Sequence, residues 1–393
     1  MVMSRSFRVV LSFLLCLPVL AWGQQTAAPA SSAQAANPAP KPADSAVPEG
    51  RIRLDVVVTD KAGKPVTDLE SKDFKLLDNN SPLETVSFQA FGGTNAKPDQ
   101  PTEVILLFDY VNDDFKTLTD ERREVEGFLQ ENGGHLAQPV SIFLLRDAGL
   151  QALRPPSTDG NELAAAVGKM ATSLAINTNA TGANGDIEKY NESIHAISSV
   201  AAYEKKRPGR KLLLWIGPGW PLLNSPHFQV TTDTMKQFFK SIVELSTDLR
   251  EARVNVYSVG IGQFHVQFAG GGGNPDSNKK PTSGGSATFV ETSDDTNPLD
   301  YLSYLKEVKQ FSQAKGADLS VKVLALHNGG RALGLDNGLK SQIDTCVQDA
   351  TAFYTLSFDA PRAGQPNEYH DLKVQIDKPG LTAHTSTGYY NQP

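Results

Sequence analysis

Four polar residues follow a long apolar run closely enough to act together. The run Thr102–Phe108 leads directly into Asp109, and Asn112, Asp113 and Asp114 come next. Carboxylate oxygens at this spacing could hold a hard divalent cation such as Mg²⁺ or Ca²⁺. One carboxylate could instead serve as the nucleophile of a hydrolase or phosphotransferase. A structural role is the third possibility, because acids at strand ends commonly cap helices or accept hydrogen bonds from backbone N–H groups.

Three apolar runs predict the strands that would position these acids. They are Thr102–Asp109, Lys211–Gly217 and Val254–Gly262, with intervals long enough for a helix between successive runs. Apolar runs without alternation are typical of parallel strands that helices cover on both faces. Ligands in such sheets bind at the carboxyl ends of the strands, where Asp109 falls. The fold class predicted for this part of the chain is α/β, with a doubly wound and mostly parallel sheet.

Further patterns predict the elements between these strands. A strand pair is expected at Gln138–Arg146 and Leu150–Arg154, with the outer strand antiparallel. The segment Ala269–Pro298 is rich in Gly, Ser, Asn and Asp and predicts a long mobile loop. Apolar residues at helical spacing predict helices over Thr117–Asn132, Asn161–Ser173, Ile187–Lys206, Thr234–Ala252, Tyr301–Gln313, Leu319–Leu326 and Asp336–Ala350.

Strand patterns also occur at both ends of the part of the chain that is expected to fold. Residues 51–93 and 351–390 each carry short runs in which apolar and polar residues alternate, as in half-buried strands. A unit of about 40 residues without a disulfide or a metal rarely folds alone. We therefore expect the two sets to pair into one small β-sandwich, with residues 100–350 inserted between them as the α/β domain.

The first 50 residues predict export. Residues 1–23 place two arginines ahead of an apolar run and end in a small-x-small site, as a cleavable signal peptide does. Residues 24–50 are rich in Ala, Pro, Ser and Gln and predict a disordered tether. Loss of the signal peptide removes two basic residues and changes the formal charge from −7 to −9, which argues against a nucleic-acid partner. No later segment is a candidate membrane span, so we expect a periplasmic, secreted or cell-surface protein.

The order of several motifs resembles a known family. The segments that look like the strands and turns of a von Willebrand factor A domain are LLFDYVNDD (106–114), GRKLLLWIGPGW (209–220), ARVNVYSVGIG (252–262) and HNGGRAL (327–333). The flanking segments 55–80 and 353–390 are similar to the VWFA-related proteins that acidobacteria export. The resemblance runs from Arg51 to Tyr390.

This resemblance implies a metal-ion-dependent adhesion site, in which Asp-x-Ser-x-Ser, a distant Thr and a distant Asp hold Mg²⁺ and leave one position open for a partner's carboxylate. Asp109 matches the first position, and Asp113 could replace the second Ser. Val111 has no side-chain oxygen, and the turn Gly217–Gly219 has no aspartate where the last ligand belongs. The chain therefore departs from the family pattern at two ligands.

The metal site implied by the resemblance is consequently degenerate. Its candidate ligands are Asp109, Asp113 and Asp114, with Thr181 or Asp186 at the position of the distant Thr. No cofactor is firmly expected. Any remaining affinity should be weak and should favour Ca²⁺ over Mg²⁺, because the Ca²⁺ shell tolerates irregular ligands better than the Mg²⁺ octahedron.

An enzyme is the alternative from a different class. The acids resemble a haloacid dehalogenase-type phosphotransfer site, but that site needs Asp-x-Asp and Val111 stands at its second position. Gly260 and Gly262 suggest a dinucleotide loop, yet His265 stands where the third glycine belongs. The sequence has no P-loop, G-x-S-x-G or H-E-x-x-H motif, and no two histidines have zinc-ligand spacing. We therefore expect no enzymatic activity.

The sequence as a whole predicts an exported, non-catalytic protein that binds another protein or an envelope component. The partner surface should be the edge formed by Asp109–Asp114, Thr181–Asp186 and Gly217–Leu222. Its candidate partner-binding residues are Asn112, Trp220 and Pro221. An exposed tryptophan could anchor a partner, and packing against the adjacent loop is the alternative for Trp220. An envelope scaffold held at a distance by the tether is the other interpretation.

Limited proteolysis of the protein without its signal peptide should cut first within residues 24–50 and 269–298. Neither segment has enough apolar residues to offset the entropy cost of ordering the chain. Mass spectrometry of the earliest fragments identifies the sites. Early cuts within Lys211–Gly219 would show that a central strand has been assigned wrongly.

Overall fold

The structure is a computed structural model of the 393-residue chain. It describes residues 50–93, 102–170, 182–220, 223, 230–261, 266–267, 288–289, 304–333 and 338–393. The predicted signal peptide, nearly all of the predicted tether and nearly all of the predicted loop 269–298 lie outside the described residues, as do Thr181 and Pro221. No helix within the described ranges is long and apolar enough to cross a membrane.

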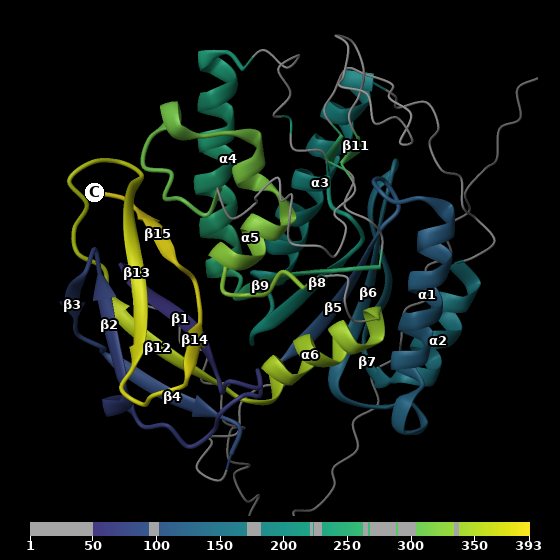
Figure 1. The fold of residues 1–393 in the computed structure, drawn as a ribbon, viewed down its shortest axis with the longest axis horizontal. Coiled ribbons are helices and arrows are strands. Elements are labelled where there is room, and N and C mark those ends of the chain that lie inside the picture. Colours follow the sequence, from purple (N-terminus) through teal and green to yellow (C-terminus); the bar gives the residue numbers. More distant parts are fainter. Residues whose placement is uncertain are drawn as a thin grey trace, which may run out of the picture. The chain divides into compact units, whose positions relative to one another are not determined.

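A five-stranded sheet forms the centre of the α/β part (Figure 1). Its order is β7-β6-β5-β8-β9, and only the outer pair β6 and β7 is antiparallel. Every residue of β5, β8 and β9 is buried, as their unbroken apolar runs predicted. A mixed α/β fold with a mostly parallel sheet is therefore confirmed. The strands are β5 (Glu103–Asp109), β6 (His135–Arg146), β7 (Gly149–Asp159), β8 (Lys211–Ile216) and β9 (Val254–Val259).

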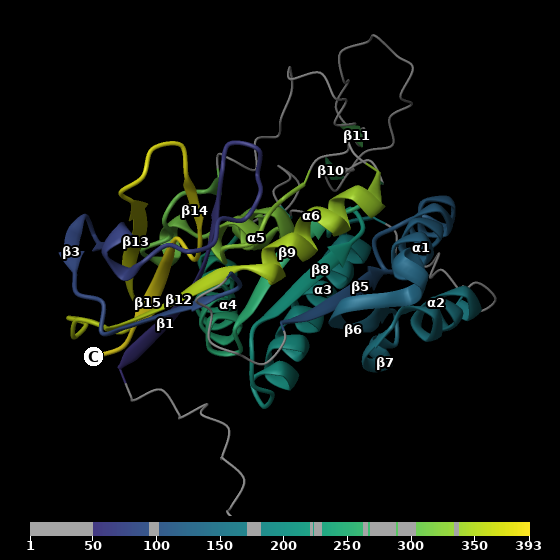
Figure 2. The same ribbon diagram turned by 90° about the horizontal axis from the view of Figure 1, so that it is seen from below.

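Helices cover both faces of this sheet (Figures 1 and 2). Side chains of β5 alternate between the faces: Leu106 packs in one apolar cluster with α1, α2 and α6, and Leu107 packs in the other with α3, α4 and α5. Each strand therefore needs apolar residues at successive positions, which is why its sequence does not alternate. The helices are α1 (Phe115–Leu129), α2 (Gly160–Lys169), α3 (Gly182–Glu204), α4 (Thr232–Glu251), α5 (Val321–His327) and α6 (Leu339–Thr351).

The helix expected over Tyr301–Gln313 is wrong in its described part, residues 304–313. Residue 304 and the turn Phe311–Gln313 are 3₁₀, and no α-helix forms within residues 304–313. The backbone N–H of Lys309 donates to the side chain of Gln313, and the carbonyl of Val308 accepts from the Tyr390 hydroxyl. These two backbone groups therefore bond to side chains and not to the backbone groups with which a helix would pair them. The other 3₁₀ turns in the described ranges are Ser71–Asp73, Glu131–Gly134 and Gly316–Leu319.

The two ends of the described chain pair with each other in two antiparallel sheets. The orders are β14-β1-β12-β4 and β15-β13-β2-β3, so each sheet contains strands from both ends. Leu54 on β1 lies opposite Leu356 on β12, and both belong to a core that side chains of both sheets share. The strands are β1 (Arg51–Thr59), β2 (Phe74–Asp78), β3 (Ser81–Leu83), β4 (Ser87–Phe91), β12 (Phe353–Asp359), β13 (Glu368–Ile376), β14 (Thr382–His384) and β15 (Gly388–Asn391). A separate short pair is β10 (Val266–Gln267) with β11 (Thr288–Phe289).

A buried ion pair joins these sheets to the α/β part. Arg253, which directly precedes β9, donates from Nε and Nη2 to the two carboxylate oxygens of Asp55 on β1, at 3.0 and 2.8 Å. The hydroxyl of Thr355 on β12 donates to the same carboxylate at 2.7 Å. The Asp55 side chain is 6% exposed and that of Arg253 is 13% exposed. Burial raises the pKa of Asp55, but Arg253 and the hydrogen bonds outweigh burial and leave it lowered.

Replacing Asp55 by Ala should lower the free energy of unfolding by about 3–5 kcal/mol, because it removes the buried carboxylate that pairs with the Arg253 guanidinium. Urea denaturation of the full chain measures the change. The matched control is Asp359→Ala, which removes the exposed pair with Arg51 and should change stability much less. Equal costs for the two substitutions would show that the Asp55 pair does not join the two parts of the fold.

Candidate functional site

Asp109 ends β5 at the carboxyl edge of the sheet, where its carboxylate is completely buried. One oxygen accepts hydrogen bonds from the backbone N–H groups of Val111 and Asn112 and from the Asn112 side chain, at 3.0–3.2 Å. The other accepts from the Asn112 side chain at 2.9 Å and from the Trp215 indole at 3.0 Å. Burial raises the pKa of Asp109 to about 6, against the opposing effect of these hydrogen bonds. Both oxygens are thus engaged within the protein.

Asp114 is the N-cap of α1. Its carboxylate accepts from the backbone N–H groups of Lys116 at 2.9 Å and Thr117 at 3.0 Å, and from the Thr117 hydroxyl at 2.8 Å. The backbone hydrogen bond from Thr117 is the main cause of a lowered pKa for Asp114. This geometry is that of a helix cap, the structural alternative that the sequence left open.

Asp113 forms a buried carboxyl pair with Glu121, one and a half turns into α1. Glu121 is completely buried and Asp113 is 9% exposed. Burial and the neighbouring acids raise the pKa of Asp113 to about 7, and burial together with Asp113 raises the pKa of Glu121 well above its usual range. Asp113 Oδ2 and Glu121 Oε2 have no hydrogen-bond donor among the described residues. Burial and the proximity of the two acids thus favour the protonated form of each carboxyl group.

Two glycines bring backbone directly against these carboxyl groups. A Cβ on Gly217 would lie 2.9 Å from Asp109 Cβ and 3.7 Å from Asp113 Oδ2. A Cβ on Gly260 would lie 3.0 Å from Glu121 Oε1, which also accepts the N–H of Ile261 at 3.2 Å. The backbone after β8 and β9 therefore occupies the space in which further ligand side chains would stand.

The residues at this edge do not fit the Mg²⁺ site of the family that the sequence resembles. Both Asp109 oxygens are engaged, Asp114 caps a helix, and the Val111 side chain packs in an apolar cluster. In the described ranges, no group of three or more His, Cys, Asp or Glu side chains is arranged to hold a metal ion. Asp186 is buried on α3, where burial raises its pKa, and Thr181 lies outside the described residues.

The expectation that Trp220 could be an exposed anchor is wrong. Trp220 is 5% exposed, and its ring packs edge-on against Trp215 with 4.9 Å between centroids. The physical reason is the turn before it: Gly219 has φ +75°, which directs the chain back onto the sheet. Asn112, the second predicted partner-binding residue, is only partly exposed and donates to Asp109 and to Ser193 on α3. Pro221 lies outside the described residues.

Sequence reasoning missed two residues at this edge. Glu121 lies on the buried stripe of α1 with Leu118 and Val125, so helical spacing alone places it in the core. Phe115, the first residue of α1, is 54% exposed and directly follows the acidic turn. It is the large exposed side chain that Trp220 was expected to provide.

Comparisons with known proteins are weak. No protein-family model matches the chain, and no curated protein matches its sequence. Solved structures that it resembles include the pilus adhesin SpaC of Lactobacillus rhamnosus GG in its open conformation (TM-score 0.37, 9% identity, 82% of this chain and 48% of that chain). Two others are the SpRpn10 VWA domain (0.25, 13%, 42% and 76%) and proximal thread matrix protein 1 from the mussel byssus (0.25, 12%, 42% and 39%). The chain therefore spans less than half of the adhesin and of the byssus protein.

Replacing Asp113 by Asn should stabilise the protein more at pH 8 than at pH 5. Because the pKa of Asp113 is raised to about 7 in the folded chain, the folded state holds a proton that the unfolded state releases above about pH 4. The stability that this proton contributes is fully present below about pH 4 and is lost as the pH rises to about 7. Asparagine stays neutral, so its advantage should be greater at pH 8 than at pH 5 by roughly 2–3 kcal/mol, since one pH unit in this window corresponds to about 1.4 kcal/mol.

Urea denaturation at the two pH values measures this difference. Asp120→Asn is the control, because Asp120 lies on the surface of α1 in ion pairs with Lys116 and Arg123. It should change stability by a similar small amount at pH 5 and pH 8. An Asp113→Asn variant whose effect on stability is the same at both pH values would rule out the raised pKa of Asp113.

Proposed function

We propose that this chain is an exported, non-catalytic binding protein whose α/β part is a von Willebrand factor A-type domain with a degenerate metal site. One observation carries the proposal: the Asp109 carboxylate is completely buried and accepts five hydrogen bonds from Val111, Asn112 and Trp215. A carboxylate held in this way supports the end of the strand. We therefore assign to the surface around Asp109 a role in binding a partner.

The alternative of a hydrolase or phosphotransferase requires a reactive carboxylate that a substrate can reach. Asp109 is the acid that such a site would use, and its oxygens already accept donors that lower their nucleophilicity. Asp113 and Glu121 are buried against each other and against the backbone at Gly217 and Gly260. Access is thus restricted for every acid except the helix cap Asp114, and this favours binding over catalysis.

We propose that Phe115 is the main side chain that contacts the partner. Aromatic side chains dominate the binding energy of many protein interfaces, because they bury a large area with little loss of conformational entropy. Phe115 is more than half exposed, and the Asp114 cap fixes the start of its helix. A protein or an envelope component with a complementary apolar pocket is the partner that this surface fits.

We further propose that partner binding does not depend on a divalent cation. The Asp109 and Asp114 carboxylates are engaged by protein donors, so Mg²⁺ would have to displace hydrogen bonds to obtain either of them as a ligand. Any remaining binding should be weak and should favour Ca²⁺. Export is supported by the composition of residues 1–50, and a periplasmic, secreted or cell-surface location follows from it. A scaffold role in the envelope is compatible with the same partner surface.

Affinity capture from envelope extracts of the source cells should recover the same partner in Mg²⁺ and in chelator. The Phe115→Ser variant should recover at least about tenfold less, because loss of a central aromatic anchor typically costs 2 kcal/mol or more. Tyr203→Ser is the matched control: Tyr203 is also about half exposed but lies near the end of α3, and its loss should leave capture unchanged. Capture that requires Mg²⁺ would restore a metal-dependent adhesion mechanism and refute the proposal.

A further inference from the structure

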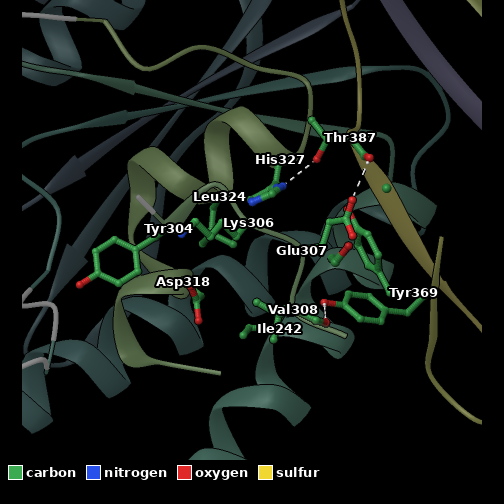
Figure 3. A pocket seen from close by; sticks show the side chains of 13 residues that line it. Ile242, Tyr304, Lys306, Glu307, Val308, Asp318, Leu324, His327, Tyr369 and Thr387 are labelled. Carbon is green, nitrogen blue, oxygen red and sulfur yellow. Dashed lines mark hydrogen bonds between the residues drawn. The ribbon is translucent and has the colours of Figure 1, made fainter. Parts of the chain in front are cut away.

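A second site lies away from Asp109, between two helices of the α/β part and the strands at the end of the chain (Figure 3). It is a cavity of about 50 Å³. Ile242 on α4, Leu324 on α5, Tyr369 on β13 and Tyr390 on β15 are among the residues that line it. A water molecule needs about 10–15 Å³ by the same measure, so the cavity can take a group of several atoms.

Two acids and one lysine line this cavity. They are Asp318, Glu307 and Lys306. Glu307 pairs with the exposed Lys309 at 2.6 Å. Asp318 is 9% exposed, and within the described part of the chain no Lys or Arg side chain forms an ion pair with it. Its carboxylate accepts a hydrogen bond from the backbone N–H of Lys315, whose ammonium lies 5.5 Å from the Tyr304 ring centroid.

A buried carboxylate without an ion pair is unfavourable. The hydrogen bond from the Lys315 N–H and the charge of Lys315 offset only part of this cost. Burial raises the pKa of Asp318 to about 6, so at neutral pH the group is mostly charged in a position that disfavours charge. The other titratable groups do not remove this charge. Burial lowers the pKa of His327, which leaves its ring neutral and bonded to the Thr387 hydroxyl, and Lys306 is exposed on the rim.

The aromatic walls also favour a cation. Tyr369 and Tyr390 pack edge to face, with 5.2 Å between their centroids, and their hydroxyls are directed to the carbonyls of Thr387 and Val308. Because these hydroxyls are engaged with the protein, the rings offer the cavity mainly their carbon surface. Such rings attract an ammonium or guanidinium group through their quadrupole and pack against the methylene groups that carry it.

A shallow groove of about 450 Å³ adjoins the cavity and shares Glu307 and Tyr369 with it. Its other charged residues are Glu368, Asp371 and Lys309, so three acids face one lysine. Asn79 and Asn80, in the turn between β2 and β3, add amide groups that can bond a peptide backbone. The groove therefore extends the acidic character of the cavity along the surface.

We infer that the cavity binds the side chain of a lysine or arginine from a basic peptide segment, with the flanking residues of that segment in the adjoining acidic groove. The charged end would pair with Asp318, and its methylene stem would lie among Ile242, Val308 and the two tyrosine rings. A neutral side chain would leave Asp318 buried and unpaired, and an acidic one would be repelled by it. The site is independent of the surface around Phe115.

Fluorescence anisotropy with short labelled peptides and the full chain tests this inference. A peptide with one central lysine in a Gly/Ser background should bind at least tenfold more tightly than the same peptide with acetyl-lysine, norleucine or glutamate at that position. An arginine peptide should bind within a fewfold of the lysine peptide. The Asp318→Asn substitution, which keeps the bond from the Lys315 N–H, should weaken lysine-peptide binding at least tenfold.

Two controls keep the test decisive. Glu244→Gln alters an exposed acid on α4 outside the cavity and should leave the affinity unchanged. If Asp318→Asn does not fold, as judged by circular dichroism, Glu307→Gln replaces it and should weaken binding severalfold. Equal binding of the norleucine peptide, or binding of n-butylammonium without binding of the peptide, would overturn the inference. Absence of lysine-peptide binding at millimolar concentration would overturn it as well.

Discussion

The buried ion pair between Arg253 and Asp55 joins the α/β part of the fold to the strands at the two ends of the described chain. Arg253 lies between α4 and β9 at φ 55°, and its carbonyl accepts the N–H of Lys211, the first residue of β8. Its guanidinium extends from the α/β part to β1, where it bonds the Asp55 carboxylate. A charge buried at this depth is tolerated only where its partner is fixed. The position of β1 relative to the start of two central strands is thereby determined.

A second buried pair of an arginine and an aspartate lies at α6. Arg331 forms two hydrogen bonds with the Asp349 carboxylate, at 2.6 and 2.7 Å, and the Tyr257 hydroxyl donates to the same group. Arg210, which is 1% exposed, donates to the Asp349 carbonyl and stacks over the Phe353 ring. The end of α6 is thus fixed where the chain enters β12. Two ion pairs, Arg253 with Asp55 and Arg331 with Asp349, thus stabilise the fold that positions Asp109 at the carboxyl edge of the sheet.

The sequence predicted the parts of this structure that depend on short-range pattern. Unbroken apolar runs identified β5, β8 and β9, and the position of Asp109 at a strand end followed from them. The burial of Trp220 could not be predicted from short-range pattern. Its burial depends on Gly219, where a Cβ would lie 2.6 Å from Val321, a residue about 100 positions later in the chain. Asp318 is similar, because nothing near it in sequence shows that helices and distant strands enclose it.

Pairing between the two ends of the chain has a consequence for the order of folding during synthesis. Arg51 on β1 lies opposite Asp359 on β12, a separation of 308 residues. At a synthesis rate of about 5–20 residues per second, β1 must wait roughly 15–60 s for its partner strand. All the central strands and helices are made in that interval. β1 is thus made before the α/β part but can pair with β12 only after it, and its apolar residues remain without that strand while the α/β part forms.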